Sequence, residues 1–182
     1  MTLPLRPLSP GMVMAGPAMT VRCRPGDNLA IHRAVAAAEP GDVLVIDYGG
    51  STESGPFGEI MALACQLRGV VGLVIDGAVR DSANIVQMNF PVFARDLNIR
   101  GTTKRDPGEV GGTIALGGVR IERGDLVVAD ADAILALPAR DAEAALAAGE
   151  ARAAVEAAIM ERLRGGETTL QVLGLTGQEA LP

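Results

Sequence analysis

The chain has 182 residues, of which 48% are hydrophobic and 2% aromatic, and its formal net charge is −6. This length suits one domain, whose core must be built from aliphatic side chains because aromatic ones are scarce. The negative charge and the shortage of stacking aromatics argue against a nucleic-acid partner, since binding a polyanion depends on clustered Lys and Arg.

Apolar runs in the chain are interrupted by Asp and Gly well short of the ~20 residues that a membrane helix requires, so no membrane span is expected. Residues 1–10 lack the apolar core of a secretory signal. The two cysteines, Cys23 and Cys65, lie far apart in apolar segments. We therefore expect reduced, buried thiols in a cytoplasmic protein.

Counts of two other residue types bear on mechanism. The one histidine, His32, lies in a predicted helix, where a surface or packing role is expected, and one His cannot assemble a His-rich zinc site. The one lysine, Lys104, lies in a polar loop beside Arg105, without the apolar pocket that lowers the pKa of a Schiff-base lysine. Carbonyl chemistry, if present, is therefore expected to use a metal.

The first third of the chain alternates strand and helix patterns. Residues 15–23 are typical of a strand, and 25–28 supply a turn and a helix cap for a helix over 29–38. Residues 43–47 then predict a buried strand. This order indicates an α/β domain.

A glycine-rich loop follows at residues 48–57. A nucleotide-binding or methyltransferase loop is one alternative, but the GxGxxG spacing is absent. We interpret the loop as a mobile rim to the helix that follows it.

Gly58 opens a segment in which Ile60, Met61, Leu63 and other apolar residues recur at helical spacing. The backbone N–H groups of the first turn of such a helix have no partners within the helix. A small anion such as a carboxylate can therefore bind there.

The run at 70–75 is apolar without alternation, as expected for a strand that is covered on both faces. The chain then turns outward to Arg80 and Asp81, near the carboxyl end of this strand, where open α/β sheets often bind ligands. Arg80 offers a planar set of donors to a carboxylate or enolate oxygen, and Asp81 offers hard oxygens to Mg²⁺ or Mn²⁺. The alternative is a solvated surface ion pair.

Beyond Asp81, the pattern predicts a short helix over 82–88 and a strand over 91–94. The loop at 100–108 is polar and mostly basic, and it is either a solvated turn or a lip that attracts di- or tricarboxylates. Short antiparallel strands are expected over 113–138. Asp130 and Asp132 in that region are interpreted as turn-forming carboxylates in preference to metal ligands.

The carboxyl-terminal part is expected to be helical. Residues 141–164 form an Ala-rich pattern with an apolar stripe, and Gly165 and Gly166 end it. A helix of this kind packs on its own domain or on a neighbour. A tail follows over 165–182, and we find no second domain.

The motifs Gly58-Glu59-Ile60-Met61 and Asp76-Gly77-Ala78-Val79-Arg80-Asp81 resemble the pyruvate- and metal-binding signature of the RraA-like family. That family includes divalent-metal aldolases of 4-hydroxy-4-methyl-2-oxoglutarate and 4-carboxy-4-hydroxy-2-oxoadipate, which also decarboxylate oxaloacetate. The resemblance runs from Gly16 to Leu175. It implies a single RraA-like domain over 1–182, an α-β-β-α sandwich of swivelling-domain type, assembled as a homotrimer or homohexamer with active sites at subunit boundaries.

Carried over by position, the resemblance implies that the backbone of Gly58, Glu59, Ile60 and Met61 holds the carboxylate of a 2-oxo acid. Arg80 then binds the keto or enolate oxygen and Asp81 the Mg²⁺ or Mn²⁺ ion, while Glu59, or an acidic residue of a neighbouring subunit, orients a proton-carrying water.

The chain departs from the family pattern at Asn84, where some aldolases are acidic, and at Ala133, where many members have Gly. It also begins without the longer amino-terminal helical segment that many aldolases have. The family also contains RraA, which binds and inhibits a ribonuclease. The alternative to a metal-dependent aldolase is therefore a non-catalytic regulator, and the net charge of −6 would permit docking to a basic protein. Arg80-Asp81 and the aldolase-like segment at 168–175 favour the enzyme.

Overall fold

The computed structural model describes residues 4–175. They divide into two compact units, of which the first ends at Ala139 and the second begins at Arg140. The strands are β1 (Arg6–Pro7), β2 (Met14–Arg22), β3 (Val43–Asp47), β4 (Gly72–Ile75), β5 (Ala78–Val79), β6 (Val92–Ala94), β7 (Asp96–Leu97), β8 (Glu109–Val110), β9 (Ile114–Leu116), β10 (Val119–Ile121), β11 (Leu126–Ala129) and β12 (Ile134–Leu137). The helices are α1 (Leu29–Ala37), α2 (Glu59–Leu67), α3 (Ser82–Gln87), the 3-10 turn η1 (Ala139–Asp141), α4 (Ala142–Arg164) and α5 (Thr169–Val172).

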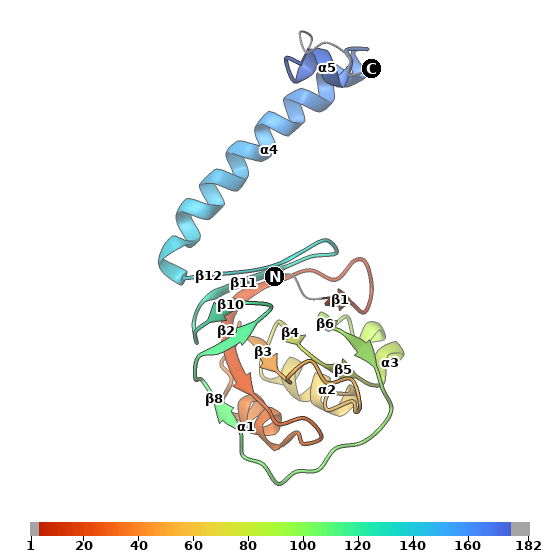
Figure 1. The fold of residues 1–182 in the computed structure, drawn as a ribbon, viewed down its shortest axis with the longest axis vertical. Helices are drawn as coiled ribbons and strands as arrows, with labels where there is room; N and C mark the ends of the chain where they lie inside the picture. The colour runs from red at the N-terminus through yellow and green to blue at the C-terminus, as the bar shows by residue number, and fades with distance from the viewer. Residues whose placement is uncertain (1–3, 176–182) are drawn as a thin grey trace. The chain divides into compact units, whose positions relative to one another are not determined.

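The first unit is built on one sheet in the order β1-β6-β4-β3-β2-β11-β12, with β8 paired to β2 (Figure 1). Strands β2, β3, β4 and β6 run parallel because α1, α2 and α3 provide the connections between them. The later strands pair antiparallel, and short turns join β9 to β10 and β11 to β12, while β11 also pairs with β2. The expected change from crossover units to hairpins along the chain is confirmed.

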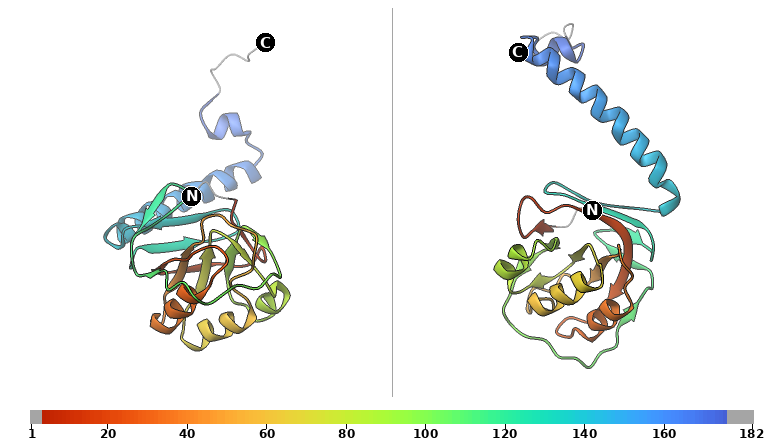
Figure 2. Two further views of the ribbon diagram at one scale, coloured as in Figure 1. Left: turned by 60° about the horizontal axis from the view of Figure 1, so that its bottom comes forward. Right: turned by 180° about the vertical axis from the view of Figure 1, so that it is seen from behind.

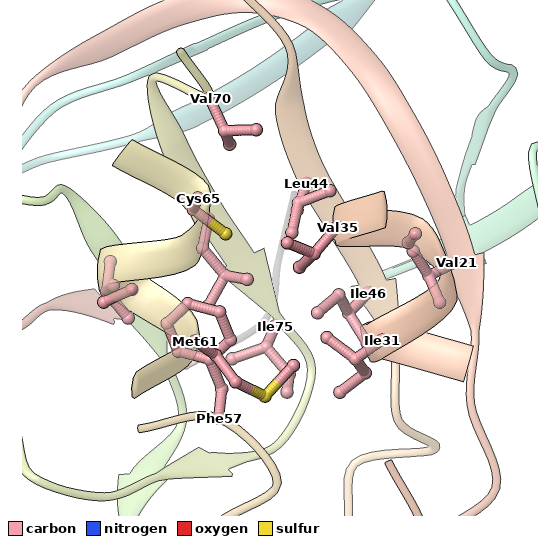
Figure 3. Packing of buried hydrophobic residues seen from close by; sticks show 14 of the residues in the cluster. Val21, Ile31, Val35, Leu44, Ile46, Phe57, Met61, Cys65, Val70 and Ile75 are labelled. Carbon is pink, nitrogen blue, oxygen red and sulfur yellow. The ribbon is translucent and has the colours of Figure 1, made fainter. Parts of the chain in front are cut away.

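Both faces of the parallel strands are covered. Leu44 and Ile46 of β3 pack with side chains of α1 and α2, as Figure 3 shows. Val43 and Val45, the alternate residues of the same strand, pack instead against a cluster that includes Ile114 from the β9–β10 hairpin. This double burial explains why the strand is apolar without alternation.

The layers of the first unit are therefore helices, sheet and hairpin, and two further views show α1 and α2 beside the parallel strands (Figure 2). The predicted α/β class is confirmed. No described helix is long and apolar enough to serve as a membrane span.

The second unit contains α4, which occupies the stretch predicted to be helical at 141–164. Taken by itself, this unit buries none of the α4 side chains. Thr168 and Gln171 form a reciprocal capping box at the start of α5. Residues 176–182 of the predicted tail lie outside the described residues, and the extent of the family domain over 1–182 stays a prediction.

Candidate functional site

Gly58 begins the site because the chain comes too close to its neighbours there for any side chain. A Cβ at this position would overlap Asp81 Oδ2 and would lie 2.9 Å from Arg80 Nε. Gly58 is the extended N-cap residue of α2, so this close approach places Arg80 and Asp81 directly at the amino end of that helix. The two motifs that the sequence separates by about twenty residues thus form one corner.

Asp81 occupies an unusual backbone conformation. Its φ and ψ are 56° and 34°, in the left-handed region that few residues other than glycine adopt, and it is the N-cap residue of α3. Its Oδ2 accepts a hydrogen bond from the Glu59 N–H at 3.1 Å and lies 3.6 Å from Arg80 Nε. The turn therefore directs this carboxylate toward the helix start, and such conformations concentrate at functional sites.

Arg80 is held through its backbone and stem. Its N–H donates to the Phe57 carbonyl at 2.9 Å, and 34% of its side chain is exposed. Within residues 4–175, its terminal Nη groups donate no hydrogen bond. These donors therefore remain available to an anion in front of α2.

The first turn of α2 offers two free backbone donors. The Glu59 N–H is taken by Asp81, and the Met61 N–H donates to the Gly58 carbonyl at 3.1 Å. The N–H groups of Gly58 and Ile60 donate to no residue in the described part of the chain. Of the four backbone donors predicted to bind a carboxylate over Gly58–Met61, these two are therefore the ones free to do so at the positive end of the helix dipole.

Glu59 is oriented by Asn84, the position where the sequence comparison with the family predicted a departure. Asn84 Nδ2 donates to Glu59 Oε2 at 2.6 Å, from the α3 helix to the first residue of α2. Both side chains are exposed. A neutral amide at position 84 therefore fixes the Glu59 carboxylate by donating to it, which an acidic residue there would do only when protonated.

The donor set suits a hard cation in a limited way. Residues 4–175 contain no group of three or more His, Cys, Asp or Glu side chains arranged to hold a metal ion. Asp81 nevertheless keeps Oδ1 free, because both of its contacts with described residues use Oδ2. Mg²⁺ commonly binds through one or two carboxylates and completes its shell with water and substrate, so Asp81 fits as a single protein ligand.

The other residues singled out from the sequence lie elsewhere. Lys104 and His32 are exposed. Asp130 Oδ1 accepts the N–H groups of Asp132 and Ala133, as a turn-forming carboxylate does. Cys23 and Cys65 are free and buried, and burial is the main cause that raises the pKa of each thiol to about 12.

The interpretation of residues 48–57 as a mobile rim is wrong for the second half of the loop. Residues 54–57 are buried, and the Ser54 hydroxyl lies 3.0 Å from that of Tyr48. The Gly55 N–H donates to the Arg100 carbonyl at 2.9 Å. Loops 48–57 and 98–105 thus meet, and they line a groove of about 550 Å³.

Sequence reasoning missed Asp27, which fastens the second of these loops. Its carboxylate accepts a hydrogen bond from the Thr103 hydroxyl at 2.5 Å. The sequence predicts that Asp27 belongs to a turn and helix cap. Its Oδ1 does accept a hydrogen bond from the Leu29 N–H. Nothing local indicates the partner 76 residues away.

This arrangement, an α/β sheet with Arg80 and Asp81 at the start of α2, is accompanied by a family match. The model of the RraA-like family, described as Aldolase/RraA, matches residues 2–136. The chain belongs to the RraA-like family.

Relatives within this family carry different names. A protein of Halalkalibacterium halodurans, named "Putative 4-hydroxy-4-methyl-2-oxoglutarate aldolase", is 38% identical over 138 residues, which span 76% of this chain and 66% of that relative. The matched region is thus just under two thirds of the relative's length.

Two solved structures share the fold. An uncharacterised protein from Pseudomonas syringae pv. tomato str. DC3000 has a TM-score of 0.86 and 27% identity, covering 94% of this chain and 80% of its own. The RNA-processing inhibitor RraA from Thermus thermophilis has a TM-score of 0.71 and 27% identity, covering 76% of this chain and 84% of its own. Similarity thus extends to proteins described as an aldolase and as an inhibitor.

Proposed function

We propose that this protein is a divalent-metal-dependent carbon–carbon lyase. It cleaves 4-hydroxy-2-oxo acids to release pyruvate and decarboxylates oxaloacetate at the same site. Family membership and the aldolase-named relative support a lyase in general terms. The observation that carries the specific proposal is the corner where Asp81 Oδ2 lies 3.1 Å from the Glu59 N–H and 3.6 Å from Arg80 Nε.

Each residue of this corner binds a different group of the substrate. The free N–H groups of Gly58 and Ile60 bind the 2-oxo acid's carboxylate at the positive end of α2. The Arg80 guanidinium lies beside that position and donates to the keto oxygen. Asp81 Oδ1 would hold Mg²⁺ or Mn²⁺, which when bound would polarise the keto oxygen as a Lewis acid.

Arg80 contributes most as charge develops. In aldol cleavage the 4-hydroxyl loses its proton, the C3–C4 bond breaks, and its electron pair forms the enolate of pyruvate. Loss of carbon dioxide from oxaloacetate leaves the same enolate. A fixed guanidinium next to the enolate oxygen stabilises this charge more than the ground state, which lowers the barrier of both reactions.

Glu59 is the candidate for proton movement. Its carboxylate is held by Asn84 through Oε2, and within the described residues Oε1 accepts no hydrogen bond. Oε1 can orient a water that takes the hydroxyl proton and returns one to C3 of the enolate. The side chains of Glu59 and Asn84 are both exposed, so an acidic residue of a neighbouring subunit could also reach this position. Such a residue is the second candidate for orienting the water.

The experiment is an assay of pyruvate release by the purified chain. The substrates are a panel of 4-hydroxy-2-oxo acids and oxaloacetate, each with and without added Mg²⁺ or Mn²⁺. The proposal expects metal-dependent release from at least one 4-hydroxy-2-oxo acid and from oxaloacetate. Release of no pyruvate from any of them contradicts it.

The structural similarity to an RNA-processing inhibitor supports a second candidate function. As a regulator, the acidic chain would dock to a basic region of a ribonuclease without chemistry at Arg80 and Asp81. Tight binding to such an enzyme by a protein that releases no pyruvate would favour this function.

The proposed setting of either function is cytoplasmic, with the chain assembled as a homotrimer or homohexamer. The exposed apolar side chains of Ile60, Leu63 and Leu67 on α2 support an assembly that covers this helix next to the site. Light scattering of the purified protein gives the mass of the assembly and so separates the monomer, trimer and hexamer.

A further inference from the structure

We infer that Asp27 is a positioning residue for Arg80, acting through Thr103 and the loop at 98–105. This inference rests on the proposed function for its kinetic consequences. Asp27 lies at the turn before α1 and does not touch the Gly58 corner. Its effect on the chemistry has to pass along the loop.

The hydrogen bonds of Asp27 bind this loop to the body of the domain. Only 3% of Asp27 is exposed, and its Oδ2 accepts both the Thr103 hydroxyl at 2.5 Å and the Arg105 N–H at 2.7 Å. The backbone adds two more bonds, from Thr103 N–H to the Gly26 carbonyl and from Asn28 N–H to the Thr103 carbonyl. Thr103 thus attaches the loop to the carboxylate of Asp27, which is almost fully buried.

The other end of the same loop is pinned beside Arg80. The Asn98 N–H donates to the Val79 carbonyl at 2.9 Å, one residue before Arg80. The Arg100 carbonyl accepts the Gly55 N–H at 2.9 Å. Gly101 and Thr102 therefore span the short gap between fixed points at Arg100 and Thr103.

Gly101 is the part of this span that borders the guanidinium. A Cβ built on Gly101 would lie 3.9 Å from Arg80 Nη1, which is an ordinary van der Waals contact. On its other sides the Arg80 side chain borders Gly55 and Gly58, whose Cβ positions would be 3.1 Å from its Cβ and 2.9 Å from its Cγ. Two backbone segments, the stretch 55–58 and the loop at Gly101, thus border Arg80, and the second of them depends on Thr103.

The physical consequence follows from the free Nη groups of Arg80. These groups donate no hydrogen bond to described residues, so their orientation depends on packing and on the contact of Arg80 Nε with Asp81 Oδ2 at 3.6 Å. Loss of the hydroxyl bond to Asp27 would leave the Thr103 end held only by its backbone bonds to Gly26 and Asn28. The loosened span at Gly101 would then widen the rotamer distribution of Arg80. The enolate would then meet a guanidinium that has to be reoriented in each turnover, which raises the barrier without abolishing substrate binding.

The test compares Thr103→Val with Thr103→Ser, which differ in the hydroxyl that Asp27 accepts. Position 103 is exposed, so both variants should fold, and circular dichroism checks this. Thr103→Val should lower kcat for pyruvate release about tenfold with KM nearly unchanged, because displacing a catalytic group by ~1 Å can cost up to 100-fold. Thr103→Ser should stay within about twofold of the parent. If Thr103→Val fails to fold, Thr103→Ala removes the same hydroxyl.

A double-variant cycle shows whether the effect passes through Arg80. In an Arg80→Lys background, Thr103→Val should cost less than about twofold, because residues acting as one unit are not additive. Equal losses in both backgrounds, or a Thr103→Val protein as active as Thr103→Ser, would overturn the inference.

A second readout requires no substrate. The Arg80 Nε–H signal, assigned by its loss in Arg80→Lys, should exchange with solvent faster in Thr103→Val than in the parent or Thr103→Ser. If the parent releases no pyruvate, the proposed function fails, and this exchange rate decides the positioning role by itself. Unchanged exchange in Thr103→Val would refute that role.

Discussion

Two aspartates of this protein occupy similar places and have opposite surroundings. Asp27 and Asp81 each stand just before a helix, α1 and α3, and each accepts a backbone N–H through its carboxylate. Asp27 is 3% exposed, and both of its oxygens accept hydrogen bonds. The Asp81 side chain is 32% exposed, engages only Oδ2, and sits on a left-handed backbone.

The difference separates a structural carboxylate from one suited to chemistry. Burial by itself raises the pKa of Asp27, but the hydrogen bonds from Thr103, Leu29 and Arg105 outweigh it and hold that pKa well below the usual range. Asp81 has a free oxygen beside the Arg80 guanidinium. A carboxylate whose acceptors are all occupied stabilises the fold, and one with a free oxygen and a strained backbone can bind a ligand.

The largest effect is expected at Asp81. Asn tolerates the left-handed conformation, so Asp81→Asn should keep the fold while removing the charge that is proposed to hold the metal. Pyruvate release should fall about 1,000-fold or more, since Lewis-acid stabilisation is worth several kcal/mol. In the parent, EDTA should abolish pyruvate release and Mg²⁺ or Mn²⁺ should restore it. Full turnover after exhaustive chelation would exclude this mechanism.

Arg80→Lys should have the next largest effect. Lys retains the charge but not the planar donor geometry, and loss of one oxyanion donor typically costs about 100- to 1,000-fold in rate. Aldol cleavage and oxaloacetate decarboxylation should fall together because they share the enolate, with little change in Tm. A large drop in one activity and not in the other would show that Arg80 does not bind a common enolate.

Asp27→Ala tests the structural side of the comparison. It leaves the donors of Leu29, Arg105 and Thr103 without their buried acceptor, which should lower the free energy of unfolding by about 3 kcal/mol. Urea titration at neutral pH measures this loss, and Asp81→Asn should cost far less stability because Asn tolerates the left-handed backbone. Equal losses at the two sites would remove the distinction between them.

The pH dependence of the Asp27 contribution has a definite sign. Its folded pKa lies below the unfolded value of about 3.9, so the stabilisation is fully present above about pH 4 to 5. It declines as the pH falls below 4 toward the folded pKa. The stability difference between the parent and Asp27→Ala should therefore shrink between neutral pH and pH 3, and a constant difference would contradict the depressed pKa.

The smallest effect is expected at Lys104. This residue is exposed in the loop whose Thr103 binds Asp27, so it lacks the burial that favours the neutral amine of a Schiff-base lysine. Lys104→Ala should keep substantial turnover, and borohydride added with substrate should leave no adduct in a mass spectrum of the parent. A covalent adduct at Lys104 would replace the enolate mechanism with a Schiff-base one.

Much of the fold could be predicted because its patterns are local. The run at 70–75 lacks alternation since both faces of β4 are covered, and Gly58 marks the start of α2. Arg80 and Asp81 could also be selected, since they follow a buried strand and match a family motif. The burial of residues 54–57 and the pairing of Asp27 with Thr103 could not be predicted, because both depend on segments distant in sequence.

The sequence by itself determined the α/β alternation, the helix start at Gly58 and the chemical types at positions 80 and 81. Hydrophobic periodicity and helix capping depend on residues a few positions apart, so the sequence alone is enough to predict them. Only the tertiary structure decided which Asp81 oxygen is free, which N–H groups of α2 remain unpaired, and that Asp27 holds the loop bordering Arg80. These depend on hydrogen bonds between segments that meet only when the sheet and its helices have packed.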